Sequence, residues 1–112
     1  MALMALGIPI LPGKEEKWEA MAEQFSQPGP MKDKLDAARR GAGVHERTFL
    51  QESPQGKMVI VTLEGDDPAG AFGRMMADPA LRDFAEWAAD VHGLHPAAPP
   101  PPMPRLVYDS RG

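Results

Sequence analysis

Residues 44–63, VHERTFLQESPQGKMVIVTL, give the strongest indication of the fold. Residues 44–51 divide into two alternating sets of side chains, one for each face of a strand. The run MVIVTL at 58–63 is rich in β-branched residues. Both features are typical of strands. The stretch between them, ESPQG, has the composition of a hairpin loop. We therefore predict two neighbouring antiparallel strands in the middle of the chain.

Toward the N-terminus we predict another strand, followed by a bent pair of helices. Residues 3–11 form an apolar run closed by Pro12-Gly13, which is typical of a central strand buried on both faces. We expect its regular pairing to end before Pro9, which has no N–H to donate. Residues 14–24 then carry apolar side chains at helical spacing. After a Pro/Gly-rich break, residues 31–40 resume this pattern and end at a glycine cap, Gly41.

Toward the C-terminus two Asp-Pro pairs predict the starts of helices. Asp67-Pro68 and Asp78-Pro79 each place a capping carboxylate before a proline at the first helical position. We expect a helix in two pieces, the second of which ends at Gly93. Residues 95–104, HPAAPPPPMP, predict a polyproline II spacer, and residues 105–109, RLVYD, predict a last short strand that the spacer brings back to the sheet.

The order of elements is thus β-α-β-β-α-β, which predicts an α+β, ferredoxin-like domain over residues 1–112. We expect a four-stranded antiparallel sheet with both helices on one face. The other face would be bare, and its apolar share should come from some of Phe49, Ile60, Val61 and Val107. A second copy of the same sheet is the simplest cover, so we expect a homodimer.

Composition excludes several functional classes. The formal net charge is −4, and no basic cluster exceeds the pair Arg39–Arg40, so we expect neither nucleic acid nor an anionic membrane as a partner. The chain has no cysteine, which excludes disulfides, thiolate nucleophiles and cysteine-based metal sites and favours the cytoplasm. No glycine-rich phosphate loop and no GxSxG elbow is present.

Two local features resemble the dimeric α/β-barrel superfamily. They are Pro12-Gly13-Lys14 followed by Trp18, and residues 78–87, DPALRDFAEW, which resemble the second-helix pattern of antibiotic-biosynthesis-monooxygenase-like proteins and their uncharacterised bacterial relatives. The resemblance implies two sheets packed face to face, with a small-molecule cavity between each sheet and its helices. The superfamily includes cofactor-independent oxygenases of aromatic substrates, haem proteins, and stress-related proteins with no known reaction.

Three residues are candidates for catalysis. His45 and Arg47 share one strand face, where they could act as a general base and an anion stabiliser, or else as solvated groups at the sheet edge. His92 could serve as a base or a haem ligand, or stand unliganded in the last turn of its helix. With His95 and Asp90 it offers too few ligands for a metal site. The haem-degrading relatives use an asparagine, and this chain has none.

A set of aromatic and methionine side chains predicts an adaptable apolar pocket that would also serve as core. Its members are Trp18, Phe72, Met76, Phe84, Trp87 and Tyr108. We expect a small-molecule-binding protein that acts as a cofactor-independent monooxygenase on an aromatic substrate, without metal or cofactor. The alternative is a structural or stress-related dimer without a catalytic site, whose pocket is filled by its own side chains.

Overall fold

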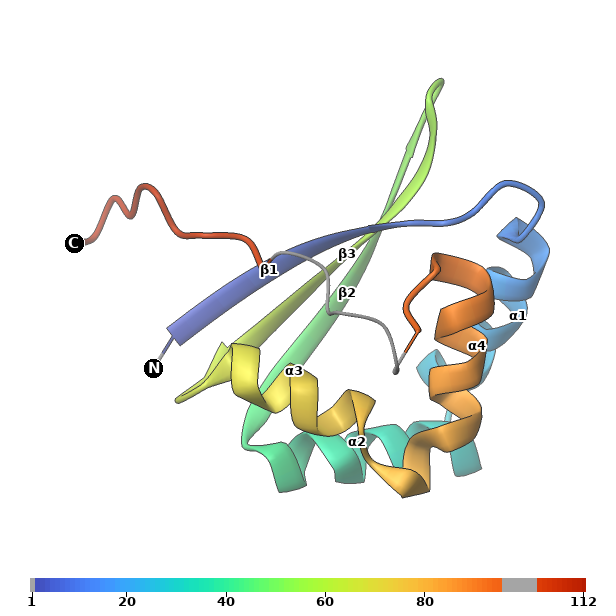
Figure 1. Ribbon diagram of the computed structural model, residues 1–112, viewed down its shortest axis with the longest axis horizontal. Coiled ribbons are helices and arrows are strands. Elements are labelled where there is room, and N and C mark those ends of the chain that lie inside the picture. Colours follow the sequence, from blue (N-terminus) through green and yellow to red (C-terminus); the bar gives the residue numbers. More distant parts are fainter. Residues whose placement is uncertain (1, 96–102) are drawn as a thin grey trace.

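The computed structural model describes residues 2–95 and 103–112, which form a sheet covered on one face by helices (Figure 1). Within these residues the sheet has three antiparallel strands in the order β1-β3-β2. The α+β class and the antiparallel sheet are therefore confirmed. The elements in chain order are β1 (Ala2–Pro9), α1 (Glu15–Ser26), α2 (Pro30–Ala42), β2 (Val44–Ser53), β3 (Gly56–Gly65), α3 (Pro68–Met76), the 3-10 helix η1 (Pro79–Leu81) and α4 (Arg82–His92).

Strand β1 is buried on one face only, so the prediction of a strand buried on both faces is wrong. Met4, Leu6 and Ile8 are buried, whereas the residues between them are exposed. Successive side chains of a strand point to opposite faces, and helices cover only one face of this sheet. Pro9 pairs with Met58 as the last residue of the strand. A proline is tolerated there because β1 lies at an edge of the described sheet.

Strands β2 and β3 form the predicted hairpin, joined by a two-residue turn at 54–55. The register places Glu46 beside Leu63 and Phe49 beside Ile60. Because side chains alternate along each strand, Glu46 and Leu63 face the helices while Phe49 and Ile60 face away from them. The hairpin therefore carries a carboxylate on the side where the core lies.

Helices α1 and α2 fill the connection from β1 to β2, and the chain breaks between them where the sequence predicts it. The buried residue of α1 is Trp18 and that of α2 is Leu35. Helix α2 ends at Gly43, whose φ of +73° lies in the left-handed region that favours glycine. The cap is therefore Gly43 and not Gly41, which lies inside the helix.

The helix in two pieces is confirmed, together with its caps. Asp67 Oδ1 accepts a hydrogen bond from the backbone N–H of Gly70 at 3.2 Å, at the start of α3. Asp78 Oδ1 accepts one from the N–H of Ala80 at 2.9 Å, at the start of η1. Gly93, with φ of +75°, ends α4. These caps fix where each helix begins and ends, and so which residues of α3 and α4 face the sheet.

The core lies between the sheet and the helices, in two clusters of buried side chains. Leu63 on the central strand is 1% exposed and Val91 on α4 is 0% exposed, so each burial stabilises the fold by about 1.5–3 kcal/mol. The first cluster is Met4, Leu35, Leu63, Met75 and Leu81. The second is Ile10, Trp18, Val59 and Val91.

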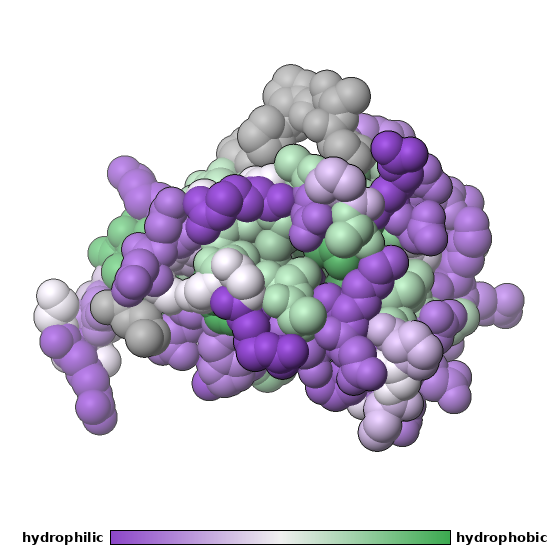
Figure 2. Space-filling view, turned by 90° about the horizontal axis from the view of Figure 1, so that it is seen from below, coloured by the Kyte–Doolittle hydropathy of each residue, from purple (hydrophilic) through white to green (hydrophobic). Residues whose placement is uncertain are grey.

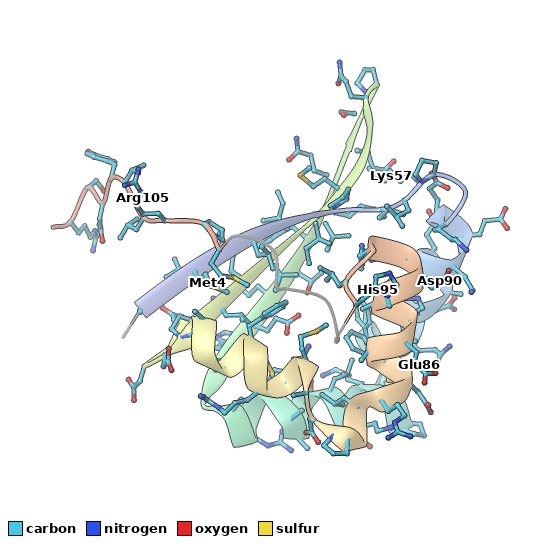
Figure 3. All side chains as sticks on the ribbon, viewed as in Figure 1. Met4, Lys57, Glu86, Asp90, His95 and Arg105 are labelled. Atoms are coloured by element: carbon cyan, nitrogen blue, oxygen red, sulfur yellow. The ribbon has the colours of Figure 1, made fainter. Side chains whose placement is uncertain are left out.

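The predicted fourth strand, at residues 105–109, is not found, and the described sheet ends at β1. These residues form irregular chain that runs outward beyond β1, where Figure 3 labels Arg105. Leu106, Val107 and Tyr108 are 70%, 79% and 78% exposed. A strand requires a hydrogen-bonding neighbour, and none of the described strands pairs with this segment. The four-stranded, ferredoxin-like arrangement is thus not observed.

The predicted polyproline spacer, residues 95–104, lies mostly outside the described residues. His95 and the residues from Met103 onward are described, and Met103 packs against the first core cluster. Among the helices of the described ranges, none has the length and apolar content that crossing a membrane requires.

Candidate functional site

A cavity of about 570 Å³ lies between the inner face of the sheet and the helices. All four α-helices and all three described strands contribute lining residues. In the view of Figure 2, apolar residues gather at the centre of the molecule and hydrophilic residues surround them. Among the lining residues of the sheet are a carboxylate, Glu46, and a hydroxyl, Thr48, on the strand face that also carries Val44.

Aromatic side chains from separate helices form the walls of this cavity. The rings of Phe84 and Trp87 lie 5.2 Å apart, tilted by 36°. On α1, the rings of Trp18 and Phe25 meet edge to face at 6.4 Å. The Trp87 indole Nε1–H donates to the backbone carbonyl of Lys17 at 3.4 Å, which fixes one edge of the ring. These walls are therefore apolar surfaces held in set orientations.

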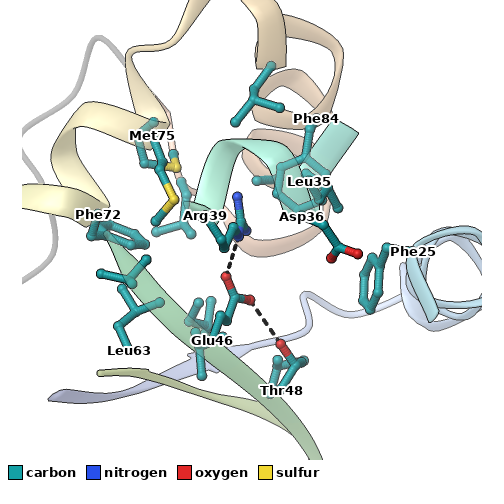
Figure 4. Close-up of a pocket in the computed structure, with 18 of the residues that line it drawn as sticks. Phe25, Leu35, Asp36, Arg39, Glu46, Thr48, Leu63, Phe72, Met75 and Phe84 are labelled. Atoms are coloured by element: carbon teal, nitrogen blue, oxygen red, sulfur yellow. Dashed lines mark hydrogen bonds and ion pairs between the residues drawn. The ribbon is translucent and has the colours of Figure 1, made fainter. Parts of the chain in front are cut away.

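The polar end of the cavity is a chain of three side chains, shown in Figure 4. Arg39 Nε on α2 donates to Glu46 Oε1 on β2 at 2.6 Å. Thr48 Oγ1 donates to the other oxygen, Glu46 Oε2, at 3.0 Å. The Arg39 and Glu46 side chains are only 17% and 19% exposed. Both carboxylate oxygens thus have a donor, as a charge removed from water requires.

The His92 ring also lines the cavity, and its tautomer follows from one contact. Its Nδ1 lies 2.8 Å from the backbone carbonyl of Pro9. A carbonyl oxygen only accepts, so Nδ1 carries the proton and Nε2 keeps its lone pair in the neutral ring. The ring stands edge to face against Trp87 at 5.4 Å. Burial lowers the pKa of His92, partly offset by the hydrogen bond to Pro9, which keeps the imidazole neutral near pH 7.

The remaining predicted site residues are divided between the cavity and the outside of the sheet. Trp18, Phe72, Met76, Phe84, Trp87 and His92 all line the cavity. Arg47 pairs with Glu64 at 3.6 Å on the outer face, in the part of the sheet where His45 is the cross-strand neighbour of Glu64. His45 borders the cavity but is exposed, and it alternates with Val44 and Glu46, which face the helices. Tyr108 is exposed in the C-terminal segment.

The structure therefore separates His45 and Arg47 from His92. The first two share the outer sheet face, and His92 lies on the other side of the sheet among the aromatic walls. Tyr108 is not among the residues that line the cavity. Of the three predicted catalytic residues, His92 alone combines burial, a fixed tautomer and a place in the cavity wall.

The cluster of Asp90, His92 and His95 has no geometry for a metal. Asp90, labelled in Figure 3, forms ion pairs with Lys14 at 2.8 Å and with Lys17. These hydrogen bonds lower the pKa of the Asp90 carboxyl to about 2. Across residues 2–95 and 103–112, no group of three histidine or carboxylate side chains could hold a metal ion. Asp90 therefore ties α4 to the start of α1.

Sequence reasoning missed the polar end of the cavity, although a signal for it was present. Glu46 and Thr48 occupy the same strand face as Val44 and Leu50. If the apolar members of that row face the core, the polar members must as well. A carboxylate at such a position requires a buried donor, and Arg39 supplies it from α2. Polar residues in a core-facing row therefore mark this site better than either histidine does.

A comparison with protein-family models, with curated proteins and with solved structures yields no match for this chain. The resemblance to dimeric α/β-barrel proteins stays a prediction.

Proposed function

We propose that this chain binds a flat, largely apolar small molecule in the cavity between its sheet and its helices. The observation that carries the proposal is the cavity itself, whose volume of about 570 Å³ falls in the range usual for small-molecule sites. Exposed residues such as Arg40 and Thr48 border the cavity, so it is open to solvent and a ligand can enter it. The tilted pair of Phe84 and Trp87 favours a planar ligand.

The test uses 2-naphthamide, a neutral planar probe, and the tryptophan side chains as reporters. The chain has two tryptophans, and both line the cavity. Binding there should shift both indole N–H signals in a ¹H–¹⁵N spectrum. Ala88→Leu, which adds bulk at a buried lining position, should weaken binding, whereas Ala37→Leu on the exposed side of α2 should not. Unshifted indole signals at saturating probe would favour the alternative of a structural dimer without a ligand.

A reaction in this cavity would use His92 as the base. We propose a cofactor-independent oxygenation, in which Nε2 takes a proton from a polycyclic phenol. A hydrogen-bearing ring carbon of the resulting anion then forms a bond to dioxygen, and the proton returns from Nε2 to give a hydroperoxide. Loss of water leaves a quinone, so the ring is the reductant, one oxygen atom enters the product and the other leaves as water. The lone pair on Nε2, set by the contact of Nδ1 with Pro9, supports this role. Oxygen uptake with a panel of polycyclic phenols would test it. His92→Ala should abolish any uptake found, and full activity in that variant would refute the role.

We also propose that the outer face of the sheet binds a second copy of the chain. This face presents large apolar side chains, with Leu3 59%, Phe49 53% and Met58 43% exposed. Its polar part holds Arg47 beside Glu64. A two-fold axis that passes between Arg47 and Glu64 would set each charge against its opposite in the partner, which would make this part of the face complementary to itself. Val61, which we expected on this face, instead faces the helices.

The oligomeric state tests this second proposal. Phe49→Asp should shift the mass measured by light scattering from dimer to monomer, because the added charge would be buried in the interface. Gln55→Asp, at the exposed hairpin turn, is the matched control and should stay dimeric. Removing the residues after Pro104 tests whether the apolar C-terminal segment also belongs to the interface. A wild-type monomer would contradict the proposal.

A further inference from the structure

The guanidinium of Arg39, at the polar end of the cavity, uses few of its hydrogen-bond donors. It has five N–H donors in a planar fork, and only Nε–H is used, in the 2.6 Å hydrogen bond to Glu46. Its two terminal nitrogens make no hydrogen bond with any of the described residues. The group is held in place nonetheless, because its central carbon lies 5.9 Å from the centroid of the Phe84 ring. Figure 4 shows Arg39 between Phe84 and Glu46.

Glu46 has no donor to offer and would repel an anionic ligand. One of its oxygens accepts from Arg39 and the other from Thr48. A second ion pair of the cavity, Lys32 with Asp36 at 2.6 Å, is likewise matched within itself. The residues at this end that still have donors to offer are therefore cationic.

The charged side chains that line the cavity also favour an anionic ligand. The lining includes three cationic side chains, Lys32, Arg39 and Arg40, and two carboxylates, Asp36 and Glu46. The third cation, Arg40, is exposed to water. Arg39 is only 17% exposed and lies beside the Phe84 ring, so water screens its charge less than it would at an open surface. An anionic group entering here would gain both the Coulomb attraction and the Arg39 N–H donors that none of the described residues uses.

We infer that the ligand of this cavity is an aromatic carboxylate, with its carboxylate on the terminal nitrogens of Arg39 and its ring between the aromatic walls. A carboxylate matches the fork of a guanidinium, and such charge-assisted bonds are among the strongest in proteins. The ring would contact Phe84, which already faces the Arg39 guanidinium. The inference rests on the proposed ligand-binding function and adds to it the chemical class of the ligand.

The experiment compares 2-naphthoate, which is ionised at pH 7, with its neutral amide, 2-naphthamide. The two probes have nearly the same shape, so their ratio of dissociation constants, measured by calorimetry, isolates the contribution of the charge. Wild-type protein should bind the carboxylate at least about tenfold more tightly. Arg39→Gln should bring the two constants together. Arg74→Gln removes an equal charge from an exposed position of α3 that does not line the cavity and should leave the ratio as it is.

A further variant keeps the inference testable if Arg39→Gln does not fold. Glu46→Gln retains Arg39 but removes the carboxylate that competes for it, so it should raise the preference for 2-naphthoate by several-fold. Equal constants for both probes in the wild type, or a preference that survives Arg39→Gln, would overturn the inference while leaving cavity binding intact. Failure of both probes to bind would instead refute the proposed function, and the inference with it.

Discussion

Replacing Arg39 and Glu46, singly and together, by methionine tests whether the polar end of the cavity exists as described. The pair is joined at 2.6 Å, and each side chain has lost about four-fifths of its exposure. A fully exposed pair contributes about 0.2–1 kcal/mol, whereas breaking a buried pair costs about 3–5 kcal/mol. Because the pair is largely but not fully buried, we expect an intermediate cost of about 2 kcal/mol for Arg39→Met, which leaves Glu46 with the Thr48 hydroxyl as its donor.

The double variant should recover most of that loss, because no unpaired charge remains in the cavity. We expect its free energy of unfolding to lie within about 0.5 kcal/mol of the wild type, since an apolar pair of similar volume commonly matches a buried ion pair. Urea unfolding followed by tryptophan fluorescence measures these values. With an m-value of about 1.5 kcal/mol/M, Arg39→Met should lower the midpoint by about 1.3 M. The double variant should also lose the preference for 2-naphthoate.

The Lys32–Asp36 pair provides the control, since its side chains are 38% and 46% exposed at i,i+4 spacing. The same double-mutant cycle there should give a coupling of only about 0.3–0.5 kcal/mol. Additive effects at Arg39 and Glu46, within about 0.3–0.5 kcal/mol, would refute the reasoning. They would mean that the two side chains are not paired in solution.

Four further predictions concern two backbone positions and the pH dependence of stability. Gly65→Ala should lower the free energy of unfolding, measured by thermal unfolding, by about 2 kcal/mol or more, because the new Cβ would lie next to the backbone oxygen of Gly43. Gly41→Ala should raise it by about 0.5–1 kcal/mol, because a Cβ within α2 at this position would have no atom within 4 Å. The pKa of Asp90 is lowered to about 2, against 3.8 for a free aspartate. Its contribution to the free energy of unfolding should therefore be present above pH 3.8 and be lost as the pH falls toward 2. In Asp90→Asn, the free energy of unfolding should depend less on pH in this range. The pKa of His92 is lowered below its ordinary value of 6.5 in the folded chain. The free energy of unfolding should therefore be highest above pH 6.5 and decline below it, because the unfolded chain binds a proton there more readily than the folded chain does. His92→Gln should remove this decline.

Local signals in the sequence were enough for most of the elements. The two Asp-Pro caps, the Gly93 cap and the β-branched run at 58–63 each depend on a few adjacent residues, and the structure bears them out. Whether β1 is buried on one face or on both depends instead on whether a second layer covers the outer face of the sheet. An apolar run alone does not contain that information.

The fourth strand and the polar end of the cavity depended on long-range pairing. Residues 105–109 have strand composition, but a strand needs a neighbour, and no described strand pairs with them. In the sequence Arg39 is only a basic residue near the end of a predicted helix. Its partner Glu46 lies on the strand that follows, so the helix pattern alone does not indicate the pair. The aromatic wall could be predicted, since apolar residues at helical spacing face the core whichever function they serve. The ion pair within it could not be assigned before the elements were placed against each other.

Native mass spectrometry of the purified protein, before and after adding 2-naphthoate, tests the central claim that the cavity binds a small molecule. We predict a species that carries one small molecule per chain, either retained from purification or taken up from solution and released on denaturation. Arg39→Gln should lose 2-naphthoate at lower collision energy than wild type. Bare protein at saturating 2-naphthoate, with both tryptophan indole signals unshifted, would contradict the account.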